Sequence, residues 1–119
     1  MLNYHNKIFV AKSNTENGEV SSDTIFTYKQ EGNILSGTYS GGEIVKGHLI
    51  GIVKENHSLQ FNYHHLNKEN KIRCGSCHSI PEILSDGRVR LHEKWKWLDS
   101  EQGEGESIVE EVKELLERS

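Results

Sequence analysis

Apolar and polar residues alternate along most of this chain. The clearest run is RVRLHEKWKW at 88–97, in which Val89, Leu91, Glu93, Trp95 and Trp97 share one face. Arginine, histidine and lysine side chains occupy the other face. A period of two residues predicts a β-strand with one covered and one solvated face, as antiparallel sheets allow. Similar alternation at 24–29, 45–53 and 59–65 predicts further strands of this kind.

Turn residues separate these runs at short intervals. Gly41-Gly42 and Asp86-Gly87 are typical of tight hairpins, because glycine adopts positive φ freely. Short strands joined by hairpins predict one all-β domain over 1–119, an antiparallel up-and-down β-barrel, which leaves no exposed sheet edge. We expect about eight strands, at 7–12, 23–30, 33–40, 43–54, 58–66, 70–79 (or on to 84), 88–98 and 105–112.

The C-terminal segment carries two conflicting patterns. Residues 107–118 have a capping box and helical spacing, whereas Ile108 and Val112 also fit a strand that would pair with 88–97. We expect a strand to about 112 and a short helix from about 113. Pro81, the only proline, has no N–H to donate to a ladder, so we expect a bulge or a strand end there.

Composition narrows the classes of function. A hydrophobic content of 34% and a charged content of 27% are polar, but the alternation indicates a folded chain. The net charge of -4, with both signs interleaved, argues against a nucleic-acid partner. The longest apolar run, 49–53, is too short for a bilayer, and the N-terminus lacks the pattern of a signal peptide. We therefore expect a cytoplasmic protein with free thiols and no membrane partner.

Several blocks carry a resemblance that covers nearly the whole chain. They are ENGEVSSDTIFTYKQEGNILSGTYSGGEIVKGHLIG, then DGRVRLHEKWKW, then EGES. Their order and spacing resemble a group of small bacterial proteins, mostly from Bacillus-like organisms, that are labelled N-acetylglutamate synthase. The resemblance implies a cytoplasmic protein with a lipocalin-like (calycin) β-barrel. The label implies an enzyme that transfers an acetyl group to glutamate.

Both cysteines fall in the run RCGSCH, whose C-x-x-C-H pattern is typical of c-type haem attachment and also suits zinc or a redox dithiol. In an extended strand, Cys74 and Cys77 point to opposite faces with Cα atoms ~10 Å apart, beyond the ~7 Å limit for a disulfide. Zinc would also need a second pair of ligands. We therefore expect no cofactor, with Cys74 inward beside Ile72 and Cys77 outward beside Arg73. A bulge at Gly75 is the one route that would bring the thiols together.

Glu93 is the most informative polar residue, because it lies on the apolar face of its strand. A buried carboxylate must be paired, protonated or in contact with water in a cavity. Other polar and aromatic residues also fall on faces that we expect to point inward, which is the usual composition of a small-ligand pocket. Gly47 and Gly51 on an inward face would leave room there. The predicted ligand contacts are Glu93, His65, Tyr63, Tyr28, Tyr39, Trp95 and Phe61.

Three interpretations follow from these residues. The first is a protein that binds a small, partly apolar molecule inside the barrel. The second is an enzyme, either with the labelled activity or with Glu93 and His65 as acid and base. The third is a structural or interaction module with a filled core, including a homodimer. The adjacent His64 and His65 face opposite sides of a strand and cannot chelate together. Histidines of different strands could meet only as cross-strand neighbours, so we favour surface or hydrogen-bonded histidines over a metal site.

Overall fold

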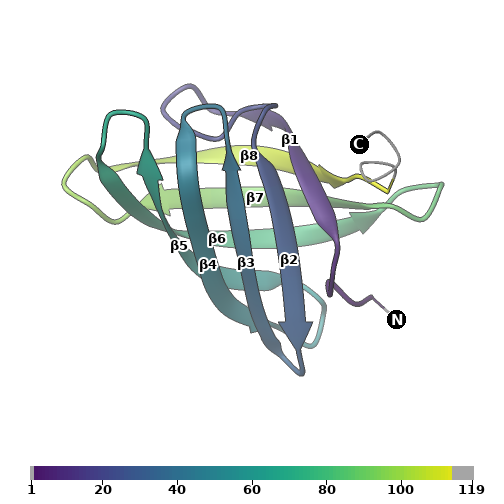
Figure 1. Cartoon of the computed structure of the whole chain (residues 1–119). Helices are drawn as coiled ribbons and strands as arrows, with labels where there is room; N and C mark the ends of the chain where they lie inside the picture. The colour runs from purple at the N-terminus through teal and green to yellow at the C-terminus, as the bar shows by residue number, and fades with distance from the viewer. Residues whose placement is uncertain (1, 114–119) are drawn as a thin grey trace.

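The computed structural model of this chain describes residues 2–113. Its eight strands form one closed antiparallel barrel, in which each strand pairs with the next and the last pairs with the first (Figure 1). The all-β, up-and-down barrel predicted from the alternation is therefore confirmed. The strands are β1 (Ile8–Asn14), β2 (Ile25–Glu31), β3 (Ile34–Gly41), β4 (Ile44–Val53), β5 (Leu59–Asn67), β6 (Ile72–Ile83), β7 (Val89–Trp97) and β8 (Gly103–Glu111).

The predicted strands match the observed ones closely, and β6 reaches Ile83, within the longer of its two predicted ranges. The expectation of a bulge or strand end at Pro81 is wrong, because Pro81 stays in register with Leu91 of β7. β5 pairs with β6 only as far as Ser79. The strand therefore has a free edge at Pro81, where a missing N–H is tolerated.

The C-terminal strand is confirmed in β8, whose residues pair with both β7 and β1. The helix expected from about 113 falls on residues outside those that the structure describes. Within residues 2–113, no helix is long and apolar enough to cross a membrane.

The inward faces follow the predicted alternation almost throughout. Every second residue of β7 from Val89 to Trp97 is buried, including Glu93. One exception is in β4, where the register shifts between Ile44 and Lys46. Ile44 is buried and Val45 is exposed, which reverses the predicted orientation of Val45. A bulge inserts one extra residue, so every side chain before it changes face.

The two cysteines point to opposite faces, as predicted, but with the orientations exchanged. Cys77 is 4% exposed and points inward, whereas Cys74 is partly exposed and Ile72 is 75% exposed. The prediction placed the apolar Ile72 inside. Arg73 is inside instead, because acidic side chains and an aromatic ring accompany it, as described below.

The barrel has two unlike ends (Figure 1). At the end that we call the closed end, Tyr4 is fully buried and its hydroxyl donates to the carbonyl oxygen of His57 at 2.6 Å. The interior there is filled by Phe9, Leu35, Leu59, Val89 and Leu91. At the other end, which we call the mouth, the loop 15–24 connects β1 to β2, and the β5–β6 and β7–β8 connections lie at the same end.

Candidate functional site

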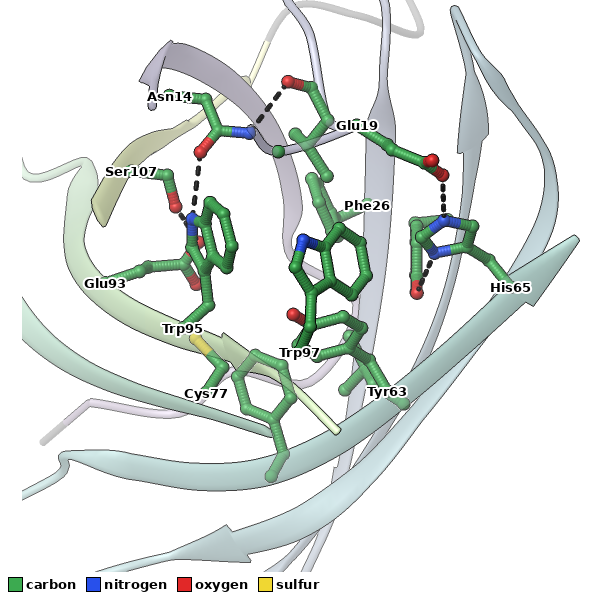
Figure 2. Close-up of a pocket in the computed structure, with 15 residues that line it drawn as sticks. Asn14, Glu19, Phe26, Tyr63, His65, Cys77, Glu93, Trp95, Trp97 and Ser107 are labelled. Carbon is green, nitrogen blue, oxygen red and sulfur yellow. Dashed lines mark hydrogen bonds and ion pairs between the residues drawn. The ribbon is translucent and has the colours of Figure 1, made fainter. Parts of the chain in front are cut away.

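A cavity of about 40 Å³ lies in the mouth half of the barrel (Figure 2). This is room for a few water molecules. Six of the seven predicted ligand contacts line this cavity, namely Glu93, His65, Tyr63, Tyr39, Trp95 and Phe61. They come from β3, β5 and β7, whose inward faces converge at this height of the barrel.

Tyr28, the seventh predicted contact, does not line the cavity. Its ring packs against Phe9, at 4.9 Å between centroids, and against Phe61 at 6.4 Å. Its buried hydroxyl has no hydrogen-bond partner among the described residues. Burial, together with the charge of Glu93 nearby, raises the pKa of Tyr28 well above its ordinary value.

The room expected beside the inward glycines is occupied, so that expectation is wrong. A Cβ atom at Gly47 would lie 2.5 Å from the ring of Tyr39, and one at Gly51 would lie 2.4 Å from the Cβ of Phe61. Gly47 lets the ring of Tyr39, and Gly51 lets the start of the Phe61 side chain, lie close to β4. The two glycines therefore shape the wall of the cavity and do not enlarge it.

Two tryptophans form the apolar centre of the cavity wall. The rings of Trp95 and Trp97 lie 5.6 Å apart, and Tyr63 packs edge-on against Trp97 at 5.8 Å. Each indole N–H is used at the mouth: Trp95 donates to Asn14 Oδ1 at 2.9 Å, and Trp97 donates to the carbonyl oxygen of Asn17 at 3.1 Å. The tryptophans therefore connect the cavity directly to the base of loop 15–24.

Glu93 lies on one side of the tryptophans, with Ser107 beside it (Figure 2). One carboxylate oxygen accepts a hydrogen bond from Ser79 at 2.9 Å and the other accepts one from Ser107 at 3.0 Å. Burial raises the pKa of Glu93 above its ordinary value, although these hydroxyl donors oppose the shift. The sequence predicted a Glu93 that is paired, protonated or in contact with water in a cavity; the structure shows its carboxylate hydrogen-bonded to two serines in the lining of the cavity.

Cys77 lines the same cavity, with its sulfur 3.6 Å from the hydroxyl of Ser79. Burial raises the pKa of the Cys77 thiol well above its ordinary value. The thiol is therefore protonated at neutral pH, which makes it a packing group and not a nucleophile.

His65 lies on the opposite side of the tryptophans (Figure 2). Its Nε2 is 2.8 Å from the carboxylate of Glu19, and its Nδ1 is 2.9 Å from the hydroxyl of Tyr39. A carboxylate only accepts, so Nε2 carries the proton and Nδ1 of the neutral ring accepts from Tyr39. Burial lowers the pKa of His65, although Glu19 opposes the shift, so the ring is neutral at pH 7.

The side chain of Glu19 points from loop 15–24 into the barrel and accepts hydrogen bonds from residues of two strands. Besides His65, its carboxylate accepts from Asn67 Nδ2 at 3.1 Å and from an Arg73 guanidinium nitrogen at 3.0 Å. Burial raises the pKa of Glu19, but the hydrogen bonds from His65 and Asn67 and the charge of Arg73 outweigh it and lower the pKa overall.

Arg73 is held by a second carboxylate as well. Its Nε donates to Asp99 at 2.6 Å, and its guanidinium carbon lies 3.8 Å above the ring of Trp97. The hydrogen bond from Arg73 lowers the pKa of Asp99. The mouth thus carries a buried cation with an anionic partner on each side.

Several of these residues were not predicted, for physical reasons. Trp97 lies on the inward face of β7 that the alternation identified, although it was not among the predicted ligand contacts. Arg73 gives no local signal, because an arginine in a strand ordinarily faces water. Glu19 lies in a loop whose path over the mouth depends on tertiary contacts. Within residues 2–113, no group of three or more metal-ligating side chains is close enough to hold an ion.

The comparisons with known proteins add one finding. A family model described as "Avidin-like protein" matches residues 2–112. No curated protein matches the chain. The family match agrees with the barrel that the sequence resemblance implied, but it gives no support to the label N-acetylglutamate synthase or to a Bacillus origin.

Proposed function

Because this chain belongs to the avidin-like protein family, we propose that it binds a small, partly apolar molecule inside the mouth of its barrel. The observation that carries the proposal is the cavity itself, which has an aromatic centre and polar groups on two opposite sides (Figure 2). This is the usual composition of a small-ligand site: apolar walls give affinity, and a few fixed polar groups give orientation.

In this proposal, each side of the cavity has its own part. Trp95, Trp97 and Tyr63 contact the apolar body of the ligand. Glu93 contacts a polar group at one end, and His65 contacts a polar group at the other. Burial raises the pKa of Glu93, which favours its protonated form relative to an exposed carboxyl group, and the protonated form can donate a hydrogen bond as well as accept one.

The ligand cannot enter the barrel without a change at the mouth. Small-ligand pockets usually enclose about 300–1,000 Å³, whereas this cavity encloses about 40 Å³. The strands form a continuous hydrogen-bonded ring, so they resist separation. Loop 15–24 lacks regular secondary structure and covers the mouth, so we propose that it moves to admit the ligand.

Binding explains the site better than acid–base catalysis does. Glu93 and His65 line the same cavity, but Glu93 bonds to two serines and His65 bonds to Tyr39 and Glu19. No hydrogen bond joins them. We accordingly propose a binding protein and assign no reaction to the site.

A ligand titration tests the proposal. Trp95 and Trp97 are the only tryptophans of the chain, so the intrinsic fluorescence reports the cavity directly. Biotin, the ligand of avidin, and a panel of neutral and anionic molecules of similar size would be titrated. We expect at least one to change the fluorescence and to raise the melting temperature, because a ligand that binds only the folded state stabilises it.

A matched pair of variants locates the binding. Leu49→Phe adds volume to the cavity wall and should abolish binding, whereas Leu59→Met, at the closed end, should leave it unchanged. Circular dichroism would confirm that both variants fold. Equal binding by both, or no binding by the wild type to any probe, would contradict the proposal.

Location and assembly are separate proposals. We propose that the protein works in the cytoplasm, where its two free cysteines would stay reduced. Thiol titration of protein taken from cells under acid quench would test this. A homodimer stays a prediction from the sequence, which light scattering at several protein concentrations would check.

A further inference from the structure

Glu19 occupies a built anion site with a side chain of the same molecule. Its carboxylate accepts hydrogen bonds from His65, Asn67 and Arg73, which are 2%, 3% and 6% exposed. These donors come from β5 and β6, the rigid part of the barrel, whereas Glu19 comes from loop 15–24. The three donors are therefore part of the barrel, whereas the carboxylate that they bind belongs to the loop that covers the mouth.

The donors keep their positions through contacts that do not involve Glu19. His65 is fixed by Tyr39 through its other ring nitrogen. Asn67 accepts hydrogen bonds from the backbone N–H groups of residues 69 and 71. Arg73 is fixed by two contacts with Asp99 and by the ring of Trp97. Three donors aimed at one point would thus remain aimed there if Glu19 withdrew.

The charges around the site select the kind of anion. Among the described residues, Arg73 is the one lysine or arginine that pairs with Glu19, and Arg73 also pairs with Asp99. His65 adds no positive charge in the neutral form that its burial favours, and in that form Nε2 donates to Glu19 while Nδ1 accepts from Tyr39. A group with one negative charge keeps this balance, whereas a phosphate dianion would add an unpaired charge. The donors also use both oxygens of a carboxylate, since His65 bonds to Oε1 of Glu19 and Arg73 donates to Oε2.

The position of Glu19 links this anion site to the cavity. Glu19 lines the cavity beside His65, next to the tryptophans (Figure 2). A ligand with its carboxylate at the donors would therefore place its apolar body between Trp95, Trp97 and Tyr63. Withdrawal of Glu19 also removes one set of the contacts that hold the loop over the mouth, and movement of the loop is the change that a larger ligand requires.

We infer that the ligand of this barrel carries a single carboxylate, which replaces the Glu19 carboxylate on His65, Asn67 and Arg73 as loop 15–24 moves away. The inference rests on the proposed function. Glu19 acts as a built-in competitor, so the apparent affinity for the ligand is lowered by the fraction of molecules in which Glu19 holds the site.

A matched pair of probes tests the ligand class. Hexanoate and hexanamide have the same shape and differ in charge, and both would be titrated into the whole protein by fluorescence and calorimetry. We expect hexanoate to bind more tightly than hexanamide by about tenfold or more, because charge-assisted hydrogen bonds are about twice as strong as neutral ones. Hexyl phosphate should bind more weakly than hexanoate.

Two variants test the competition. Glu19→Gln keeps the size of the side chain but removes its charge, so hexanoate binding should tighten by about tenfold relative to the wild type. Glu16→Gln removes an exposed carboxylate from the same loop and should leave hexanoate binding unchanged. Hexanamide binding should respond much less to Glu19→Gln, because the donors prefer a charged acceptor.

The Trp97 indole N–H gives a structural readout, because it donates to the Asn17 carbonyl oxygen in the loop. In a nitrogen–proton NMR spectrum, hexanoate should shift this signal strongly. Equal affinities for hexanoate and hexanamide, or no tightening in Glu19→Gln, would overturn the inference while leaving the proposed function intact. Absence of binding by every probe to every variant would overturn both.

Discussion

The two ends of this barrel are built from the same strands but for different purposes. At the closed end, Leu35, Leu59 and Leu91 are fully buried, and Tyr4 caps them. At the mouth, the buried side chains include His65 and Arg73, and a loop carboxylate reaches in to meet them. The closed end therefore supplies stability, and the mouth keeps polar groups that an apolar filling would stabilise better. Such groups are retained at a cost, which indicates function.

The largest expected effect is the loss of packing at the closed end. Leu91 is 0% exposed, so Leu91→Ala should lower the free energy of unfolding by about 3 kcal/mol through lost burial and the cavity left behind. Urea denaturation would measure it. Ile80, on the outer face of β6, is 55% exposed, so Ile80→Ala should change stability by less than about 0.5 kcal/mol. Similar losses in the two variants would remove the distinction between core and surface here.

The next effect concerns the buried cation at the mouth. Arg73→Met leaves the carboxylates of Glu19 and Asp99 without their shared partner. Removing one member of a buried ion pair costs about 3–5 kcal/mol, and partial exposure of both acids reduces the expected loss to about 2 kcal/mol.

A double variant sharpens this result. In Arg73→Met with Glu19→Gln, one of the stranded charges is gone, so the loss should be smaller than the sum of the two single losses. Urea denaturation of all four proteins completes the cycle. Strict additivity would mean that Glu19 and Arg73 do not interact, and that their ion pair contributes nothing to the free energy of unfolding.

The difference between the ends also explains how far the sequence could be interpreted. A period of two residues predicts most of the strands and most inward faces, because one face of each strand must be covered along its whole length. The same period cannot distinguish the two ends. It places Glu93 inside, but the partners Ser79 and Ser107 come from neighbouring strands whose register the pattern does not contain.

Burial of a charge is the harder problem. The prediction for β6 took the apolar Ile72 as inward, whereas Arg73 and Cys77 are inside. Arg73 is stabilised there by Asp99 from the β7–β8 loop and Glu19 from the β1–β2 loop. Since both partners are distant in the chain, no local pattern predicts the exchange. The anion site was missed for the same reason.

The third prediction compares the two carboxylates of the cavity by their response to pH. Glu93 has a raised pKa in the folded state, so between the unfolded and the folded pKa the folded form holds a proton that the unfolded chain has released. Its contribution to stability is therefore lost as pH rises above about 4.5. Glu19 has a lowered pKa, so its contribution is present above about 4.5 and is lost as pH falls.

Urea denaturation from pH 3 to pH 8 would measure this (roughly the range over which carboxyl groups titrate). The stability of the wild type relative to Glu93→Gln should fall with rising pH, by about 1.4 kcal/mol for each unit of pKa difference. Relative to Glu19→Gln it should rise with pH, by less, because Glu19 touches solvent. Slopes of the same sign would show that the two carboxylates do not differ as described.

The smallest effect is expected at Gly18, in the loop that closes the mouth. A Cβ atom there would lie 2.4 Å from Asn14 Nδ2 and 2.9 Å from the ring of Trp95. Asn14 cannot easily yield, because its amide donates to the carbonyl oxygen of Val20 and accepts from Trp95. Gly18→Ala should therefore displace the closed loop and lower global stability by less than about 1 kcal/mol, since alanine also restricts the unfolded chain.

Hydrogen exchange shows where this displacement acts. The amide of Thr15 donates to the Glu106 carbonyl oxygen and that of Gly18 donates to the Thr15 carbonyl oxygen, so both should exchange faster in Gly18→Ala. The Val89 amide, bonded to Glu111 at the closed end, should keep its protection. Ser22→Ala, an exposed change in the same loop, should alter neither. Equal acceleration at both ends would mean that the mouth and the closed end open together, and the loop could not then move while the rest of the barrel stays folded.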